Sequence, residues 1–80
     1  MSSTLTIFLI KYFGMKIGDR IKELRKEKNF SQSQLARRIG VSQKAVDYWE
    51  LGTNEPKASY IVKLAELFEV SADFLLGIDD

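Results

Sequence analysis

The stretch SQSQLARRIGVSQKAVDYWELG, residues 31–52, decides the fold of this chain. Ser31 predicts a helix start, because a serine side chain can cap the free N–H groups of a first turn, and Gln34 completes a capping-box pattern. Gly40 predicts the end of that helix, since glycine adopts a positive φ at little cost. Ser42 then caps a second helix. The pattern predicts two short helices joined by the tight turn IGVS, which makes them cross at a steep angle.

Apolar residues in these two helices recur at spacings of three and four, which places them on one inner side. These residues are Leu35, Ala36, Ile39, Val41, Val46 and Trp49. The outer face of the second helix, which ends at Gly52, carries Gln43, Lys44, Asp47 and Tyr48. On an ordinary surface helix such a face only meets solvent. In a tight pair of capped helices, the second helix is the one that enters a DNA groove.

The four outer side chains have chemistry that suits base edges in the major groove. Gln43 can pair with adenine through both amide atoms, and Lys44 can donate to guanine O6 and N7 or bind a phosphate. Tyr48 can touch a thymine methyl group or a phosphate. Asp47 can accept from cytosine or can instead orient Lys44. We therefore predict that Gln43, Lys44, Asp47 and Tyr48 read bases.

Three further helices are predicted from apolar stripes and end signals. They cover residues 17–28, with Asn29 closing the first, residues 57–68, and residues 71–76, which Ser71 caps and Gly77 ends. Lys57 is a poor N-cap where Ser or Asp would be expected. No strand pattern interrupts residues 17–76, so the expected fold is an all-α domain of five helices.

The first residues differ in composition from the rest of the chain. Residues 4–13 are rich in β-branched and aromatic side chains, which predicts an extended strand. The alternatives are an extension that covers part of the domain surface, or a helix that continues into the next one. The apolar run is too short to span a membrane and lacks the basic start of a secretory signal. We expect an N-terminal extension at 1–14, one domain at 15–77 and an acidic tail at 78–80.

Composition narrows the function further. The chain of 80 residues has no cysteine and no histidine, which excludes disulfides, thiolate zinc sites and the usual general base of enzymes. The net charge is only +1, but ten Lys/Arg against six Asp/Glu lie between residues 16 and 57, and residues 64–80 hold five acids and no base. A basic half beside an acidic half fits a protein that turns one face toward phosphates. An enzyme is not expected, nor a cofactor, a metal or a small-molecule ligand.

The stretch from Ile17 to Gly77 resembles the helix-turn-helix domain of the phage repressor/Cro-like family, also called the xenobiotic-response-element (XRE) family. The pieces that carry the resemblance are IKELRKEKNFSQSQLA, RIGVSQKAV, YWELGTNEP, IVKLAELF and VSADFLLG. The resemblance implies a lambda-repressor-like fold in which residues 42–51 form the recognition helix. It covers about three quarters of the chain, and residues 1–13 lie outside it.

The resemblance also implies roles that spacing does not provide. It places Gln32 and the loop residues Thr53, Asn54 and Lys57 on the DNA backbone, and we expect the same of Ser42 at the start of the recognition helix. It pairs Arg25 with Glu50 in a structural ion pair. Arg37 and Arg38 are expected to stay solvated.

The preferred function is that of a cytoplasmic transcriptional regulator, most simply a repressor, that binds double-stranded operator DNA as a homodimer. No association with a membrane is expected. Two copies would bind half-sites about one helical turn, roughly 34 Å, apart. Candidate dimer surfaces are residues 71–76, with Phe74 and Leu76, and the apolar N-terminal segment. Core packing is the alternative role for Phe74. The alternative function is an antitoxin-type module that binds a partner protein as well as DNA.

Overall fold

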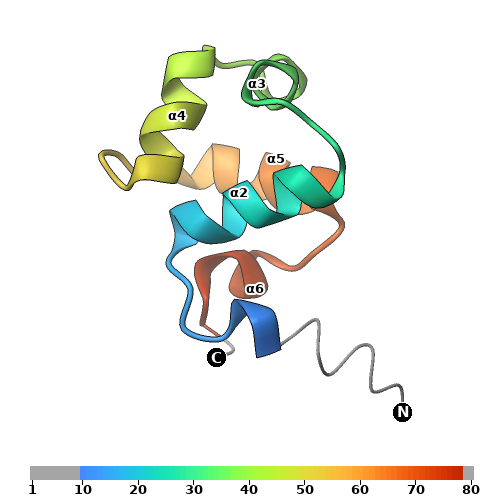
Figure 1. Cartoon of the computed structure of the whole chain (residues 1–80), viewed down its shortest axis with the longest axis vertical. Coiled ribbons are helices and arrows are strands. Elements are labelled where there is room, and N and C mark those ends of the chain that lie inside the picture. The colour runs from blue at the N-terminus through green and yellow to red at the C-terminus, as the bar shows by residue number, and fades with distance from the viewer. Residues whose placement is uncertain (1–9, 79–80) are drawn as a thin grey trace.

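Five helices form the protein in the computed structural model, which describes residues 10–78 (Figure 1). Their bounds are α2 Ile17–Glu27, α3 Gln32–Ile39, α4 Gln43–Leu51, α5 Ala58–Phe68 and α6 Ala72–Leu76. Residues 10–12 form one further helical turn before α2. The described residues contain no strand, and the predicted all-α architecture is confirmed.

The predicted helix ends agree with the structure because local hydrogen bonds decide them. Ser31 accepts from the backbone N–H of Gln34, whose side chain accepts from the backbone N–H of Ser31, so the predicted capping box is present. Asn29 has φ 60° and Gly40 has φ 86°, the left-handed conformation expected at both positions. Lys57 precedes α5 without a side-chain cap, also as expected.

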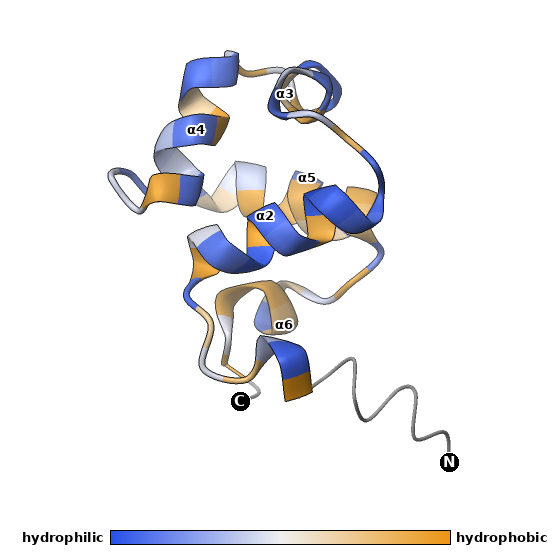
Figure 2. Cartoon of the chain, in the orientation of Figure 1, coloured by the Kyte–Doolittle hydropathy of each residue, from blue (hydrophilic) through white to orange (hydrophobic). Residues whose placement is uncertain are grey.

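The core lies where the apolar stripes of the five helices meet. Its buried side chains include one or more from every helix: Ile21, Leu24, Leu35, Ala36, Ile39, Val46, Trp49, Ile61, Leu64, Phe68 and Leu75. Figure 2 shows that α5 and α6 are mostly apolar, whereas the start of α4 and the outer side of α3 are polar. The end formed by α3 and the start of α4, which lies opposite α6 (Figure 1), is therefore a polar part of the fold.

The predicted strand at residues 4–13 is wrong at residues 10–12, which are helical, and its first six residues lie outside the described part. The helical turn places the ring of Tyr12 in the core with 0% exposure, and the Tyr12 hydroxyl donates to Glu27 at 3.2 Å. Gly14, with φ 78°, turns the chain into α2. Burial of one aromatic ring on the helices outweighs a local preference for strand.

Arg20 is fully buried and links both ends of the described chain to α2. Its Nε donates to the carbonyl of Met15 at 2.9 Å and its Nη1 donates to the carbonyl of Phe74 at 2.8 Å. The ring of Phe74 lies 5.4 Å from the guanidinium and 5.1 Å, edge to face, from the ring of Tyr12. Phe74, which had core packing as an alternative to dimer contact, is thus partly buried within its own chain, whereas Leu76 is 44% exposed.

Candidate DNA interface

The orientation of α4 is set from behind by two buried side chains. Val46 is 0% and Trp49 is 5% exposed, and the Trp49 ring packs against the ring of Tyr60 on α5 with centroids 5.8 Å apart. Ser42 caps the first turn through a hydrogen bond from the backbone N–H of Ala45 at 3.1 Å. With its inner face buried and its start capped, α4 presents its opposite face outward as a rigid surface.

The side chains predicted to read bases occupy that outward face in two stripes. Gln43 and Lys44 are exposed, and Asp47 and Tyr48 are partly buried. Lys44 and Tyr48, four residues apart, lie together, with the Lys44 Nζ 6.0 Å from the centre of the Tyr48 ring. Gln43 and Asp47 form the other stripe with Glu50, and this stripe faces the start of α3.

Gln32, the first residue of α3, joins the three members of that second stripe. Its Nε2 donates to Glu50 at 3.0 Å and to Asp47 at 3.2 Å, while its Oε1 accepts from the Gln43 amide at 3.2 Å. Ser33 donates from its hydroxyl to the Gln43 Oε1 at 3.2 Å. The turn IGVS thus brings the polar start of α3 against the outward face of α4.

Arg25 anchors this network from α2. Its Nε and Nη2 donate to the Glu50 carboxylate at 2.7 and 3.1 Å, and its Nη1 donates to the carbonyl of Phe30 at 2.8 Å. Both side chains are well covered, with 12% of Arg25 and 4% of Glu50 exposed. A covered two-point ion pair of this kind fixes how helices sit relative to each other more than it adds stability.

The residues assigned to the DNA backbone surround the same face. Thr53, Asn54 and Lys57 are exposed in the loop that follows α4, and the backbone N–H groups of Thr53 and Asn54 donate to the carbonyl of Tyr48 at 3.0 and 3.4 Å. Lys57 is exposed, and its ammonium group has the donors that a phosphate contact needs. The Ser42 oxygen accepts as a cap, and its hydroxyl proton can still be donated.

Sequence reasoning missed one residue and one contact of this interface. It assigned no role to Ser33 or to the contact between Gln32 and Gln43, which joins side chains 11 positions apart. Asp47 accepts from the Gln32 amide, a contact that was not expected, and its predicted role on cytosine or beside Lys44 stays a prediction. The spacing of Gln43, Asp47 and Glu50 at i, i+4 and i+7 is the one signal that could have revealed a shared partner.

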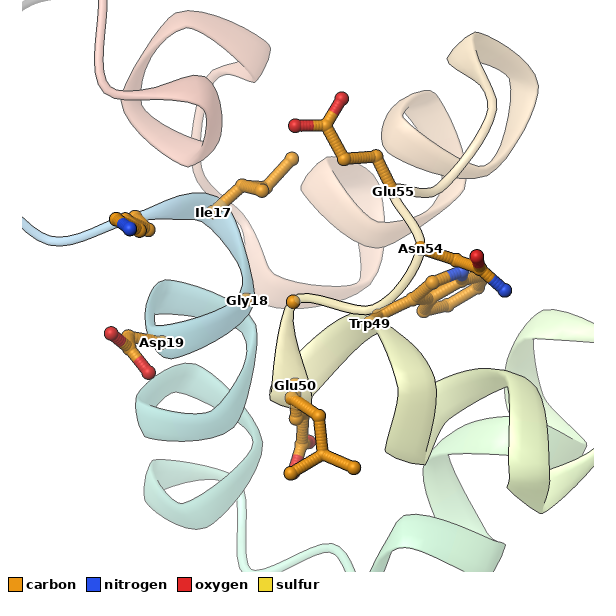
Figure 3. Close-up of a pocket in the computed structure, with 10 residues that line it drawn as sticks. Ile17, Gly18, Asp19, Trp49, Glu50, Asn54 and Glu55 are labelled. Atoms are coloured by element: carbon orange, nitrogen blue, oxygen red, sulfur yellow. The ribbon is translucent and has the colours of Figure 1, made fainter.

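A separate hollow lies on the side where α2 begins and α4 ends, with a volume of about 470 Å³ (Figure 3). Ile17, Gly18 and Asp19 line one wall, and Glu50 and Asn54 belong to the other. It contains none of the side chains predicted to read bases.

In the described residues no helix is both long enough and apolar enough to cross a membrane.

Comparison with known proteins assigns the family. A family model described as helix-turn-helix matches residues 21–75. The chain belongs to the helix-turn-helix family. This agrees with the expected phage repressor/Cro-like membership. This helix-turn-helix protein is 30% identical to the HTH-type transcriptional regulator ImmR of Bacillus subtilis (strain 168). The match covers 82% of this chain and 52% of ImmR.

The helix-turn-helix fold of this chain is similar to solved structures of regulators in complex with DNA. The P22 c2 repressor in complex with a synthetic operator is similar with a TM-score of 0.75 and 33% identity, covering 79% of this chain and 97% of that one. The biofilm regulator SinR in complex with DNA has a TM-score of 0.69 and 36% identity, covering 75% and 97%. The chain spans about half the length of the first curated relatives it matches.

Proposed function

We propose that this chain binds double-stranded DNA in a sequence-specific manner as a transcriptional regulator, most simply a repressor. The observation that carries the proposal is the two-sided character of α4. Gln43 and Lys44 are exposed on its outward face, and Val46 and Trp49 are buried on its inner face. A helix held this way fits the major groove, with its N-terminal residues nearest the bases. The P22 c2 repressor and SinR, both similar to this chain, form complexes with DNA, which supports the same role.

The binding mode follows from the placement of charge and polarity. Gln43, Lys44 and Tyr48 contact bases, while Lys57 and the loop at 53–54 contact phosphates. A single recognition helix covers only a few base pairs, so the chain binds as a homodimer to two half-sites roughly 34 Å apart. Phosphate contacts make the affinity depend on salt, and base contacts provide the selectivity. In this role the chain works in the cytoplasm and catalyses no reaction.

The alternative of an antitoxin-type module is not favoured. Its support would be a strand at the apolar residues 5–13 that binds a partner protein, whereas residues 10–12 form a helical turn that buries Tyr12. Relatives described as repressors, among them RstR of the cryptic CTXphi phage of Vibrio cholerae at 38% identity, favour regulation of transcription.

The test replaces the base-reading pair and leaves the scaffold intact. Gln43→Ala combined with Lys44→Ala should lower specific binding to the level of unrelated DNA, because each bidentate pair contributes about 1–3 kcal/mol of discrimination. The operator is first obtained by selection from random duplexes, and binding is then measured by titration. Circular dichroism checks that the helices remain.

The matched control is Lys63→Ala with Glu66→Ala on the exposed side of α5, which changes no residue of α4 and no net charge. It should bind the operator as the unmodified chain does. If the Gln43→Ala and Lys44→Ala variant keeps its selectivity, α4 is not the recognition helix.

A further inference from the structure

We propose that Ser33 is a positioning residue of the DNA-reading face, because its hydroxyl holds the Gln43 amide in the one orientation that selects adenine. The inference rests on the proposed function and names a determinant of its specificity. Ser33 is exposed, is the second residue of α3, and need not touch DNA itself.

The amide of Gln32 has one permitted orientation. Its Nε2 lies 3.0 Å from a Glu50 oxygen and 3.2 Å from an Asp47 oxygen, and carboxylate oxygens only accept hydrogen bonds. A flipped amide would place its own oxygen against both carboxylates. Glu50 cannot turn away, because Arg25 holds it through two hydrogen bonds. The Gln32 oxygen therefore always points toward Gln43.

The fixed orientation of the Gln32 amide also fixes the orientation of the Gln43 amide. Since the Gln32 oxygen accepts at 3.2 Å, the group that faces it on Gln43 must be the Nε2 donor. Ser33 completes the arrangement by donating to the Gln43 Oε1 at 3.2 Å. The amide is thus held at both ends, with its nitrogen on one residue of α3 and its oxygen on the next.

The hydrogen-bonding groups of Gln43 that these contacts do not use determine which base it can pair with. A glutamine amide carries two N–H donors and two acceptor lone pairs, and the described contacts use one of each. One donor and one acceptor remain, which match N7 and the N6 amino group of adenine in the major groove. Guanine presents two acceptors there and does not match. When DNA excludes water from this surface, the Ser33 contact strengthens and so does the preference.

The test measures base preference with the full chain and random duplex DNA as the probe. The position that loses its preference in Gln43→Ala is the one that Gln43 contacts, and the unmodified chain should prefer adenine there. Ser33→Ala should lower that preference by about two- to tenfold, the equivalent of one hydrogen bond. Ser33→Thr, which keeps a hydroxyl, should retain it. Alanine is a good helix former, so α3 should persist.

Ser59→Ala is the matched control, because Ser59 is also an exposed serine at the second position of a helix. It should leave every base preference unchanged. A preferred guanine at the Gln43 position, an unchanged preference in Ser33→Ala, or an equal weakening on all sequences would each overturn the role of Ser33. If the unmodified chain enriches no sequence, the proposed function itself fails, which is a distinct result.

Discussion

Gly18 shows how the size of one side chain limits the approach of two helices. It is buried in the first turn of α2, beside the end of α4 (Figure 3). A Cβ atom added there would lie 2.2 Å from the carbonyl oxygen of Trp49 and 3.2 Å from that of Glu50. These are backbone atoms, so they cannot move aside as a flexible side chain would. The absence of a side chain at Gly18 therefore allows α2 and α4 to pack closely.

Gly18→Ala should lower the free energy of unfolding by about 1–3 kcal/mol, the usual cost of overpacking a core. Alanine otherwise favours a helix interior, so any loss reflects the contact with α4 and not helix propensity. Urea denaturation measures the change. Lys22→Ala, at an exposed position of the same helix, should stay within about 0.5 kcal/mol. A Gly18→Ala variant as stable as the unmodified chain would contradict the close packing.

At the scale of elements, the helical turn at residues 10–12 is attached to α2 by ionisable groups. Lys11 forms ion pairs with Glu23 at 3.1 Å and with Glu27 at 3.2 Å, and the Tyr12 hydroxyl donates to Glu27. Burial of the phenol, together with the Glu27 carboxylate, raises the pKa of Tyr12 well above its ordinary value. The hydrogen bonds to Glu23 and Glu27 raise the pKa of Lys11.

These pKa shifts predict a loss of stability at high pH. The folded chain holds the Tyr12 proton more tightly than the unfolded chain, whose tyrosines ionise near about pH 10. The contribution is therefore complete below that pH and declines as pH rises above it. Unfolding free energies measured between pH 7 and 11 should show this decline, and Tyr12→Phe should make it shallower while the contribution of Lys11 remains. Parallel curves for the unmodified chain and Tyr12→Phe would contradict the prediction.

Across the whole molecule, the two ends of the fold differ in the polarity of their exposed side chains. The end formed by α3 and α4 (Figure 1) carries the polar network and the exposed Lys44, and the loop that follows α4 adds Lys57. The end formed by residues 10–12 and α6 exposes apolar side chains. These are Ile10, Phe13, Leu76 and Ile78. Phosphates should therefore meet the first end and not the second.

Lys57→Ala should weaken binding about equally on all DNA sequences and reduce the slope of log affinity against log salt by about 1, because one phosphate contact is lost. Lys11→Ala removes the same charge from the opposite end and should leave that slope unchanged. Titrations at several salt concentrations measure both. A change in base preference in Lys57→Ala would show that this residue does more than contact phosphate.

The helix ends, the core stripes and the outward face of α4 can be predicted from the amino-acid sequence, because each depends on hydrogen bonds or spacings within a few residues. Ser31, Gly40 and Ser42 act in this way. Three contacts emerge only in the folded chain: Tyr12 is buried in a helical turn, Gly18 lies against the end of α4, and Ser33 donates to Gln43. These contacts depend on how helices cross, and the crossing results from packing of the whole core, which no local pattern records.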